Sequence, residues 1–192
     1  FAGGARLFWF GAAGSVFMVA VFSLIMFTDY AKERIEIWLH PENFSALDET
    51  WQTTQGLNAI GSGGLLGVGL GNSKQKHMFV SQPQNDFIFS IICEELGLFG
   101  AIAIILMFIM LLWRMMIIAN NATDLFGAML VVGVMGHIAI QAILNIAVVT
   151  GTIPNTGISL PFISYGGSSV MFLLIEIGLV LSVAKRIQLK EL

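Results

Sequence analysis

Long stretches without any charged residue constrain this chain more than any other feature. Residues 125–149 contain no Asp, Glu, Lys or Arg, and neither do residues 7–28. Each stretch has about the 20 apolar residues needed to cross the hydrocarbon core of a bilayer. Of the 192 residues, 56% are hydrophobic and only 11% are charged, whereas a soluble domain has about 25% charged residues. The pattern predicts an integral membrane protein and excludes soluble enzyme folds.

Four runs of this kind predict four transmembrane helices, at about residues 7–28, 87–113, 125–149 and 168–184. The second run contains Glu94 and Glu95 near its start, where water or a basic partner can reach them and where we expect structural pairing. Only helices and closed barrels satisfy their backbone in lipid, and these runs lack the alternation of barrel strands. We therefore expect an all-α membrane fold with a single membrane domain over residues 1–192.

Basic residues predict the orientation of these helices, because Lys and Arg gather on the cytoplasmic side of membrane proteins. Four alternating crossings bring five of them to one side: Arg6, Arg114, Lys185, Arg186 and Lys190. Both ends of this chain are therefore predicted to be cytoplasmic. The predicted cytoplasmic segments are 1–6, 114–124 and 185–192, and the outer loops are 29–86 and 150–167. Most of the polar sequence thus faces the extracytoplasmic side.

The first run follows Arg6, as the apolar part of a signal peptide follows a basic residue. It is too long for that role and has no convincing cleavage site, so we expect a true span. Because the first residue is Phe1 rather than Met, we also expect a piece of something longer.

Charge and cysteine content exclude several functions. The net charge of -3 leaves no basic surface for a phosphate backbone, so nucleic acid is not expected as a partner. The single cysteine, Cys93, lies among apolar residues and is predicted to pack as a small hydrophobe. The His residues are scattered and no CxxC or HExxH spacing occurs. No metal site is predicted, and no cofactor is identifiable.

The long outer loop contains an uncharged glycine-rich segment, AIGSGGLLGVGLG, at residues 59–71. This segment is too short to span a bilayer. We expect it to be re-entrant or interfacial, with its backbone packed closely against other protein. Nucleotide binding is not predicted, because the Gly-Lys-Ser/Thr of a P-loop and the third glycine of a dinucleotide fingerprint are both missing.

Polar residues within the predicted spans need partners. His137, Gln141 and Asn145 recur every four residues, so they share one helical face. Interhelical hydrogen bonds are the usual fate of such residues, and a conduction pathway is the alternative. Glu176 is costly inside a membrane and is a functional candidate by default. A protonated, hydrogen-bonded carboxyl group is its alternative interpretation.

Asp86 is the last polar residue before the second predicted span, so it sits close to the hydrocarbon yet open to the outer side. Partial loss of water there would raise the pKa of its carboxyl group and make it a better base. Helix capping is the alternative role. Upstream, Lys74, Gln75 and Lys76 supply cations and donors suited to a phosphorylated or anionic head group.

Three stretches carry a specific resemblance. They are NAIGSGGLLGVGLGNSKQK at residues 58–76, QNDFIFSIICEELG at 84–97 and NIAVVTGTIPNTGISLPFISYGGSS at 145–169. Together they resemble the carboxy-terminal half of the SEDS proteins of bacterial shape, elongation, division and sporulation. The match covers nearly the whole chain in the family's order and spacing. The GLGNSKQK stretch is more similar to the FtsW and SpoVE branch than to the RodA branch.

The resemblance implies a peptidoglycan glycosyltransferase that polymerises lipid II on the outer face of the bacterial cytoplasmic membrane during cell division. It also implies about ten membrane helices, of which this chain would hold the last four. The family's catalytic aspartate lies in its DFIF motif, which corresponds here to Asp86. The family commonly has Pro-Glu three residues before this aspartate, whereas Pro83 is followed here by Gln84. The aspartate stays in register, and the loop beside it differs.

The resemblance also implies a substrate site around this aspartate. Lys74, Gln75 and Lys76 are candidates for the lipid pyrophosphate. The outer signature supplies hydroxyl and amide groups for the substrate, at Ser164, Tyr165, Gly166, Gly167 and Ser168. Its paired glycines permit backbone conformations closed to other residues.

The implied partners are lipid II, the growing glycan chain, membrane lipid, a class B penicillin-binding protein transpeptidase and other division proteins. Two functions of other classes remain alternatives. One is a lipid II flippase or transporter, with Glu176 and the polar face at residues 137–145 lining a path. The other is a non-catalytic scaffold that docks division proteins.

Overall fold

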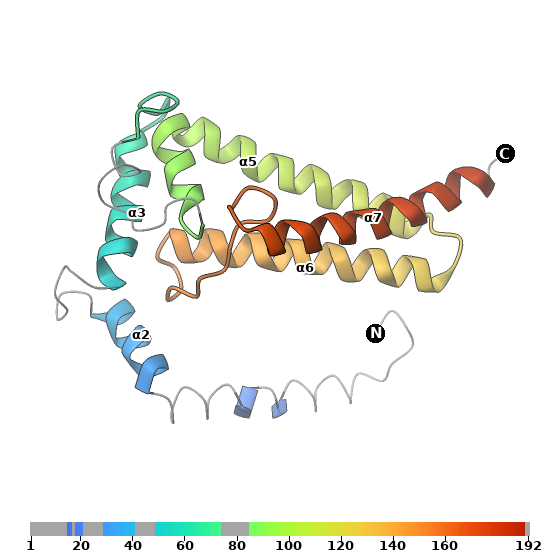
Figure 1. The fold of residues 1–192 in the computed structure, drawn as a ribbon, viewed down its shortest axis with the longest axis horizontal. Coiled ribbons are helices and arrows are strands. Elements are labelled where there is room, and N and C mark those ends of the chain that lie inside the picture. The colour runs from blue at the N-terminus through green and yellow to red at the C-terminus, as the bar shows by residue number, and fades with distance from the viewer. Residues whose placement is uncertain (1–14, 17, 21–28, 41–48, 74–84, 191–192) are drawn as a thin grey trace.

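The computed structural model describes residues 15–16, 18–20, 29–40, 49–73 and 85–190 (Figure 1). Its helices are α2 (Asp29–Leu39), α3 (Glu49–Gly63), α5 (Ile88–Asn120), α6 (Leu125–Val149) and α7 (Gly167–Lys190). No strand occurs in these ranges, as the sequence predicts. Three helices, α5, α6 and α7, are long and apolar enough to cross a membrane, so this is a membrane protein. The first predicted span, at residues 7–28, lies almost entirely outside the described residues.

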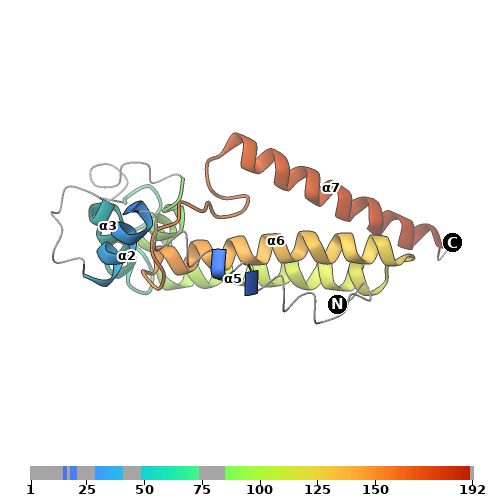
Figure 2. The same cartoon turned by 90° about the horizontal axis from the view of Figure 1, so that it is seen from below.

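Helices α5 and α6 run side by side, and α7 crosses them at an angle (Figures 1 and 2). Figure 2 shows that the C-terminal end of α7 comes close to α6. Helices α2 and α3 lie beside the opposite end of the α5–α6 pair, where the loop from α6 to α7 also lies (Figure 1). The described part of the outer loops thus gathers at one end of the long helices.

Two apolar clusters hold these helices together. One lies at the end near α3 and includes Phe87, Cys93 and Leu160; the other includes Met115, Val131 and Leu173. Cys93 is therefore part of the packing, as its sequence context predicts. Many large apolar side chains on the outer faces of α5, α6 and α7 remain exposed, as lipid-facing side chains of a membrane helix are.

The third predicted span coincides with α6 because both of its ends carry local stop signals. Asp124 is the N-cap residue, and its carboxylate accepts a hydrogen bond of 2.9 Å from the backbone N–H of Gly127. At the other end, the Thr150 hydroxyl donates to the carbonyl of Ile146 at 2.8 Å. The polar turn before residue 125 therefore has the capping role that the sequence indicates.

The second predicted span, 87–113, differs from α5 in two ways. The helix continues past Arg114 to Asn120, because an arginine within a helix can extend its charged group toward water while its stem packs on apolar surface. The helix is also broken at Gly97, where φ is 66° and ψ is -162°. In Figure 1 the short part before the break stands beside α3, and the long part follows α6. The long part alone, about 23 residues, is enough to cross a bilayer.

The turn after α3 fills the break in α5. At the break, the backbone carbonyls of Glu94 and Glu95 have no helical N–H donor, and backbone N–H groups of the glycine-rich turn donate to them instead. Backbone carbonyls of this turn accept from the two residues after the break. The four exchanged bonds are Val68 N to Glu94 O (2.9 Å), Gly69 N to Glu95 O (3.0 Å), Leu98 N to Gly64 O (3.0 Å) and Phe99 N to Leu65 O (3.4 Å).

This exchange requires the two backbones to touch. A Cβ atom on Gly67 would lie 2.1 Å from the carbonyl oxygen of Glu95, and one on Gly97 would lie 2.4 Å from the backbone nitrogen of Gly67. Both residues also have positive φ, at 78° and 66°. Glycine is therefore needed at each position for two reasons: it leaves room for the other backbone, and it adopts a positive φ without strain. The close backbone packing predicted for residues 59–71 is therefore observed. The segment is not one continuous piece, because Ala59–Gly63 is the last turn of α3.

Glu94 pairs within the protein, as predicted. Its side chain is buried, with 2% exposed, and its Oε2 accepts a hydrogen bond of 2.5 Å from the Ser73 hydroxyl. Glu94 lies before the break at Gly97, outside the long part of α5. A carboxylate in this place does not interrupt the apolar helix that can cross the membrane.

Candidate functional site

Asp86 lies two residues before the start of α5, and its neighbour Phe87 is buried. The N-cap residue of α5 is Phe87, and no side-chain hydrogen bond caps it, so Asp86 does not have the capping role that was the alternative. Burial raises the pKa of the Asp86 carboxyl group, because desolvation disfavours its charged form. A carboxylate with this surrounding is a stronger base than one in water.

The outer loop that follows α6 reaches the Asp86 carboxylate at Gly157. This glycine has a φ of 68°, and a Cβ atom on it would lie 3.6 Å from Asp86 Oδ2. The backbone of the loop therefore forms one wall beside the carboxylate. The Asn155 side chain fixes the local turn, since its Oδ1 accepts a hydrogen bond of 3.1 Å from Gly157 N–H. The short Pro-Asn-Thr-Gly sequence thus reaches the Asp86 carboxylate, although these residues are not among those predicted for the site.

Asn145 joins this loop to the residue that carries the carboxylate. Its Nδ2 donates to the backbone carbonyl of Asp86 at 2.9 Å and to that of Ile158 at 2.7 Å. The side chain is fully buried. The sequence placed Asn145 on a polar helical face but gave no sign of these partners.

The other two residues of that face have different partners. Gln141 Nε2 donates to the backbone carbonyl of Ser159 at 3.1 Å, so it holds the same loop one residue further along. His137 Nδ1 and a Glu176 carboxylate oxygen are 3.0 Å apart, which links α6 to α7. The predicted interhelical contact is therefore found for His137 and Glu176, whereas Gln141 and Asn145 bind loop backbone.

Helix α2 also contacts this loop. Arg34 Nη1 donates to the carbonyl of Asn155 at 2.5 Å, and Trp38 Nε1 donates to the carbonyl of Gly151 at 2.8 Å. Gly151 has a positive φ of 70°. Sequence reasoning missed both contacts, because Arg34 and Trp38 lie more than 110 residues before their partners and neither forms a motif.

The end of the signature, residues 160–168, forms a turn that leads into α7. Ser164 is buried, and its hydroxyl accepts a hydrogen bond of 2.7 Å from Leu160 N–H. Tyr165 is exposed, and Gly167 is the first residue of α7. Within the described part of the chain, no hydrogen bond joins residues 164–168 to Asp86. Their role as substrate ligands stays a prediction.

The paired glycines, Gly166 and Gly167, do not have the backbone conformation closed to other residues that the sequence suggests. Gly166 and Gly167 are not among the positive-φ residues of the described ranges, and nothing lies within 4 Å of a Cβ atom on Gly167. The positive φ angles of this region are at Gly151, Gly157 and Phe162. A small side chain at Gly167 is therefore sterically acceptable within the described part of the chain.

Two further predictions concern the pyrophosphate ligands and metal ligands. Lys74, Gln75 and Lys76 lie outside the described residues. In the ranges that the structure does describe, no three His, Cys, Asp or Glu side chains gather as metal ligands.

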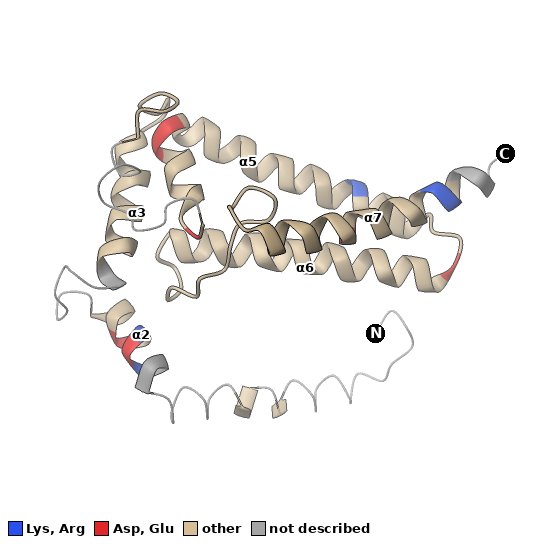
Figure 3. Ribbon diagram, in the orientation of Figure 1, with Lys and Arg blue, Asp and Glu red and all other residues tan. Residues whose placement is uncertain are grey.

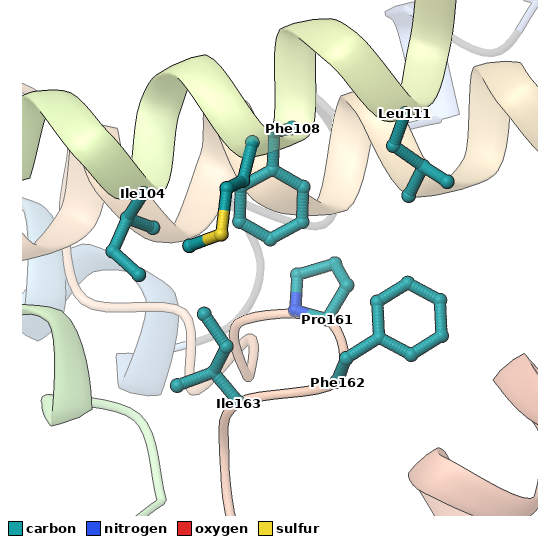
Figure 4. A pocket seen from close by; sticks show the side chains of 7 residues that line it. Ile104, Phe108, Leu111, Pro161, Phe162 and Ile163 are labelled. Atoms are coloured by element: carbon teal, nitrogen blue, oxygen red, sulfur yellow. The ribbon is translucent and has the colours of Figure 1, made fainter. Parts of the chain in front are cut away.

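An apolar pocket of about 190 Å³ lies between α5 and the signature turn (Figure 4). In Figure 4, Phe108 points from α5 toward Pro161 and Phe162 of the loop. Phe162 has a φ of 63°, which is unusual for a residue with a side chain. A pocket of this composition accepts hydrocarbon. It is lined by Ile104, Met107, Phe108, Leu111, Pro161, Phe162 and Ile163.

The fold and the site define a class of protein: a helical membrane protein with a partly buried carboxylate beside the loop between α6 and α7. The comparisons are consistent with that class. A family model described as "Cell cycle protein", of the FtsW, RodA and SpoVE proteins, matches residues 1–189. The chain belongs to this family, which confirms the resemblance seen in the sequence.

Curated relatives cover the chain almost completely. Stage V sporulation protein E of Bacillus subtilis is 45% identical over 185 residues, which are 96% of this chain and 50% of that protein. A protein of Trichlorobacter lovleyi named "Probable peptidoglycan glycosyltransferase FtsW" is 43% identical over 195 residues, 100% of this chain and 50% of that protein. The chain therefore spans about half the length of these relatives.

Solved structures have the same fold. One, described as "Structural coordination of polymerization and crosslinking by a peptidoglycan synthase complex", matches with a TM-score of 0.71 and 26% identity over 93% of this chain and 50% of that chain. Another is a variant of the rod shape determining protein RodA of Thermus thermophilus in which an aspartate is replaced by alanine. It matches with a TM-score of 0.50 and 33% identity over 65% of this chain and 37% of that chain.

Proposed function

We propose that this chain is the carboxy-terminal part of a peptidoglycan glycosyltransferase that polymerises lipid II on the outer face of the cytoplasmic membrane during cell division. Family membership and the names of the relatives support this activity. The observation that carries the proposal is Asp86, a partly desolvated carboxylate against the backbone of the signature loop. In this proposal the whole protein has about ten membrane helices, and the chain provides the last four.

Asp86 acts as the general base in this reaction. An acceptor sugar hydroxyl attacks the anomeric carbon of a donor, and the lipid pyrophosphate leaves. The hydroxyl proton passes to the Asp86 carboxylate as the new bond forms, a contribution of about 10²–10⁴ in rate. Pyrophosphate departure needs charge stabilisation more than protonation. Lys74 and Lys76 are the nearest cations in the sequence, and we assign them and Gln75 to the pyrophosphate.

The described partners of the polar residues in α6 favour the enzyme over a transporter. Gln141 and Asn145 bind the backbone of the loop beside Asp86, and His137 contacts Glu176. Gln141 and Asn145 therefore support the loop beside Asp86, which is the role that the enzyme requires. A class B penicillin-binding protein is the proposed partner, supported by the similarity to a synthase complex described by polymerisation and crosslinking.

The test is Asp86→Asn in the full-length protein with its transpeptidase partner. Asparagine keeps the size and much of the hydrogen bonding but cannot accept the proton as a carboxylate does. We expect normal membrane insertion, normal partner binding and no glycan polymer from purified lipid II. Near-normal polymerisation would overturn the assignment of Asp86.

Asp124→Asn is the matched control for this experiment. It makes the same chemical change at the N-cap of α6, where asparagine caps as well as aspartate. We expect parental polymerisation from this variant. Loss of activity in both variants would mean that the assay reports on folding rather than on chemistry.

A further inference from the structure

One side chain connects the backbone on both sides of the proposed base. Asn145 lies near the C-terminal end of α6 with 0% of its surface exposed. Its Nδ2 donates to the carbonyl oxygens of Asp86 and Ile158, at 2.9 and 2.7 Å. Only the NH₂ group of the amide can donate to two carbonyls, so these partners fix which way the amide faces.

The two acceptors belong to the two segments that meet at the Asp86 carboxylate. One is the backbone of Asp86 itself. The other is Ile158, the neighbour of Gly157, whose added Cβ atom would lie 3.6 Å from Asp86 Oδ2. A single side chain therefore sets the separation between the residue that carries the carboxylate and the loop that packs against it.

We propose that Asn145 is a positioning residue for glycosyl transfer, which fixes the Asp86 carboxylate against the signature loop through these two hydrogen bonds. This inference rests on the function proposed above. A general base must lie within hydrogen-bond reach of the proton it takes. A misplacement of about 1 Å can reduce the rate by about 100-fold.

Packing alone does not explain an asparagine here. Asn145 Oδ1 is buried and has no hydrogen-bond partner within the described part of the chain. A buried acceptor without a partner is destabilising, so a leucine of similar size would serve a purely apolar site better. The two hydrogen bonds from the amide to Asp86 and Ile158 give a reason for an asparagine at this position.

The test replaces both donors at similar volume, with Asn145→Leu in the full-length protein and its transpeptidase partner. From purified lipid II, we expect kcat to fall about 10- to 100-fold while KM changes by less than about threefold. Gln141→Leu is the matched control, because Gln141 lies on the same face and binds the same loop at Ser159, but does not contact Asp86. We expect its kcat to stay within about threefold of the parent.

Two outcomes would overturn the proposal. An unchanged kcat in Asn145→Leu would show that the two hydrogen bonds do not affect the base. An equal loss in Gln141→Leu would show that Asn145 only holds the loop. If Asn145→Leu does not fold, Asn145→Ser replaces it. Its one short donor does not span both carbonyls, so parental kcat in that variant would also overturn the proposal.

The Asp86→Asn variant separates this inference from the proposed function. Polymer formation by Asp86→Asn means that Asp86 is not the base, whatever Asn145 does. An inactive Asp86→Asn together with a fully active Asn145→Leu refutes the positioning role and leaves the proposed function intact.

Discussion

The surroundings of Asp86 disfavour its own ionised form. Its carboxyl pKa is raised by burial, beside the backbone of Gly157 and next to the buried Phe87. At neutral pH, a charge in this place reduces the stability of the fold relative to a neutral side chain of the same shape. Ionisable groups in such places are expected where the charge serves chemistry.

Asp86→Asn should therefore be at least as stable as the parent at neutral pH, although we expect it to be inactive. The folded pKa of Asp86 is raised, so the destabilisation is complete above that pKa and disappears below the pKa of an unfolded aspartate, about 3.9. Thermal unfolding in detergent should give a melting temperature equal to or above that of the parent at neutral pH, with the difference disappearing below the pKa of the unfolded residue. A large drop at neutral pH would contradict this.

At the scale of single residues, the sequence is sufficient to select Asp86 but not its neighbours. A polar residue before an apolar run is visible in the sequence, whereas the contact with Gly157 depends on how the outer loop folds back. The four-residue spacing of Asn145 and Gln141 identifies a helical face without naming what it binds. Ser164 was predicted as a substrate ligand, but its hydroxyl is hydrogen-bonded within its own turn.

At the scale of helices, the accuracy of the prediction depends on whether a boundary is set locally. The start of α6 is predicted correctly because Asp124 caps it through neighbours in the sequence. The break in α5 is not predicted, because an isolated glycine is tolerated in a helix. Gly97 breaks the helix only where the turn at Gly67 approaches and replaces the lost hydrogen bonds.

Gly67→Ala tests the contact between α3 and α5. A methyl group there would meet the Glu95 carbonyl at 2.1 Å, on a backbone with a φ of 78°. We expect destabilisation of about 2 kcal/mol or more, from overpacking and from the left-handed backbone. Thermal unfolding of the full-length protein in detergent measures it.

Gly61→Ala is the control for that variant. Gly61 lies within α3, and a Cβ atom on it meets nothing within 4 Å. Alanine has the higher helix propensity, so we expect equal or greater stability. Equal melting of the two variants would mean that the backbone contact at Gly67 is not needed.

At the scale of the whole molecule, the basic residues of the long helices gather toward one end. Figure 3 shows the Lys and Arg of α5 and α7 toward one end, with one acidic residue at the turn before α6. The two Glu of α5 lie toward the other end, where α2 carries charges of both signs. The first end also holds the short turn between α5 and α6, and the second holds α2, α3 and the loop after α6 (Figure 1). The positive-inside rule therefore predicts that the first end is cytoplasmic.

Cysteine labelling tests this orientation. In the full-length protein in intact cells, Ser81→Cys should react with a membrane-impermeant thiol reagent added from outside, and Asn121→Cys should not. Asn121 lies at the turn between α5 and α6. The buried Cys93 should give little background. Labelling of position 121 alone, or equal labelling of both, would reverse or refute the predicted topology.

The loop after α6 is attached at several closely spaced points. Helix α2 binds its carbonyls at Gly151 and Asn155, and α6 binds those at Ile158 and Ser159. The segments between these points are only a few residues long, so the loop loses its conformational entropy when the protein folds. Little entropy then remains to be lost when a ligand binds beside Asp86. The ligand meets a surface that is already ordered.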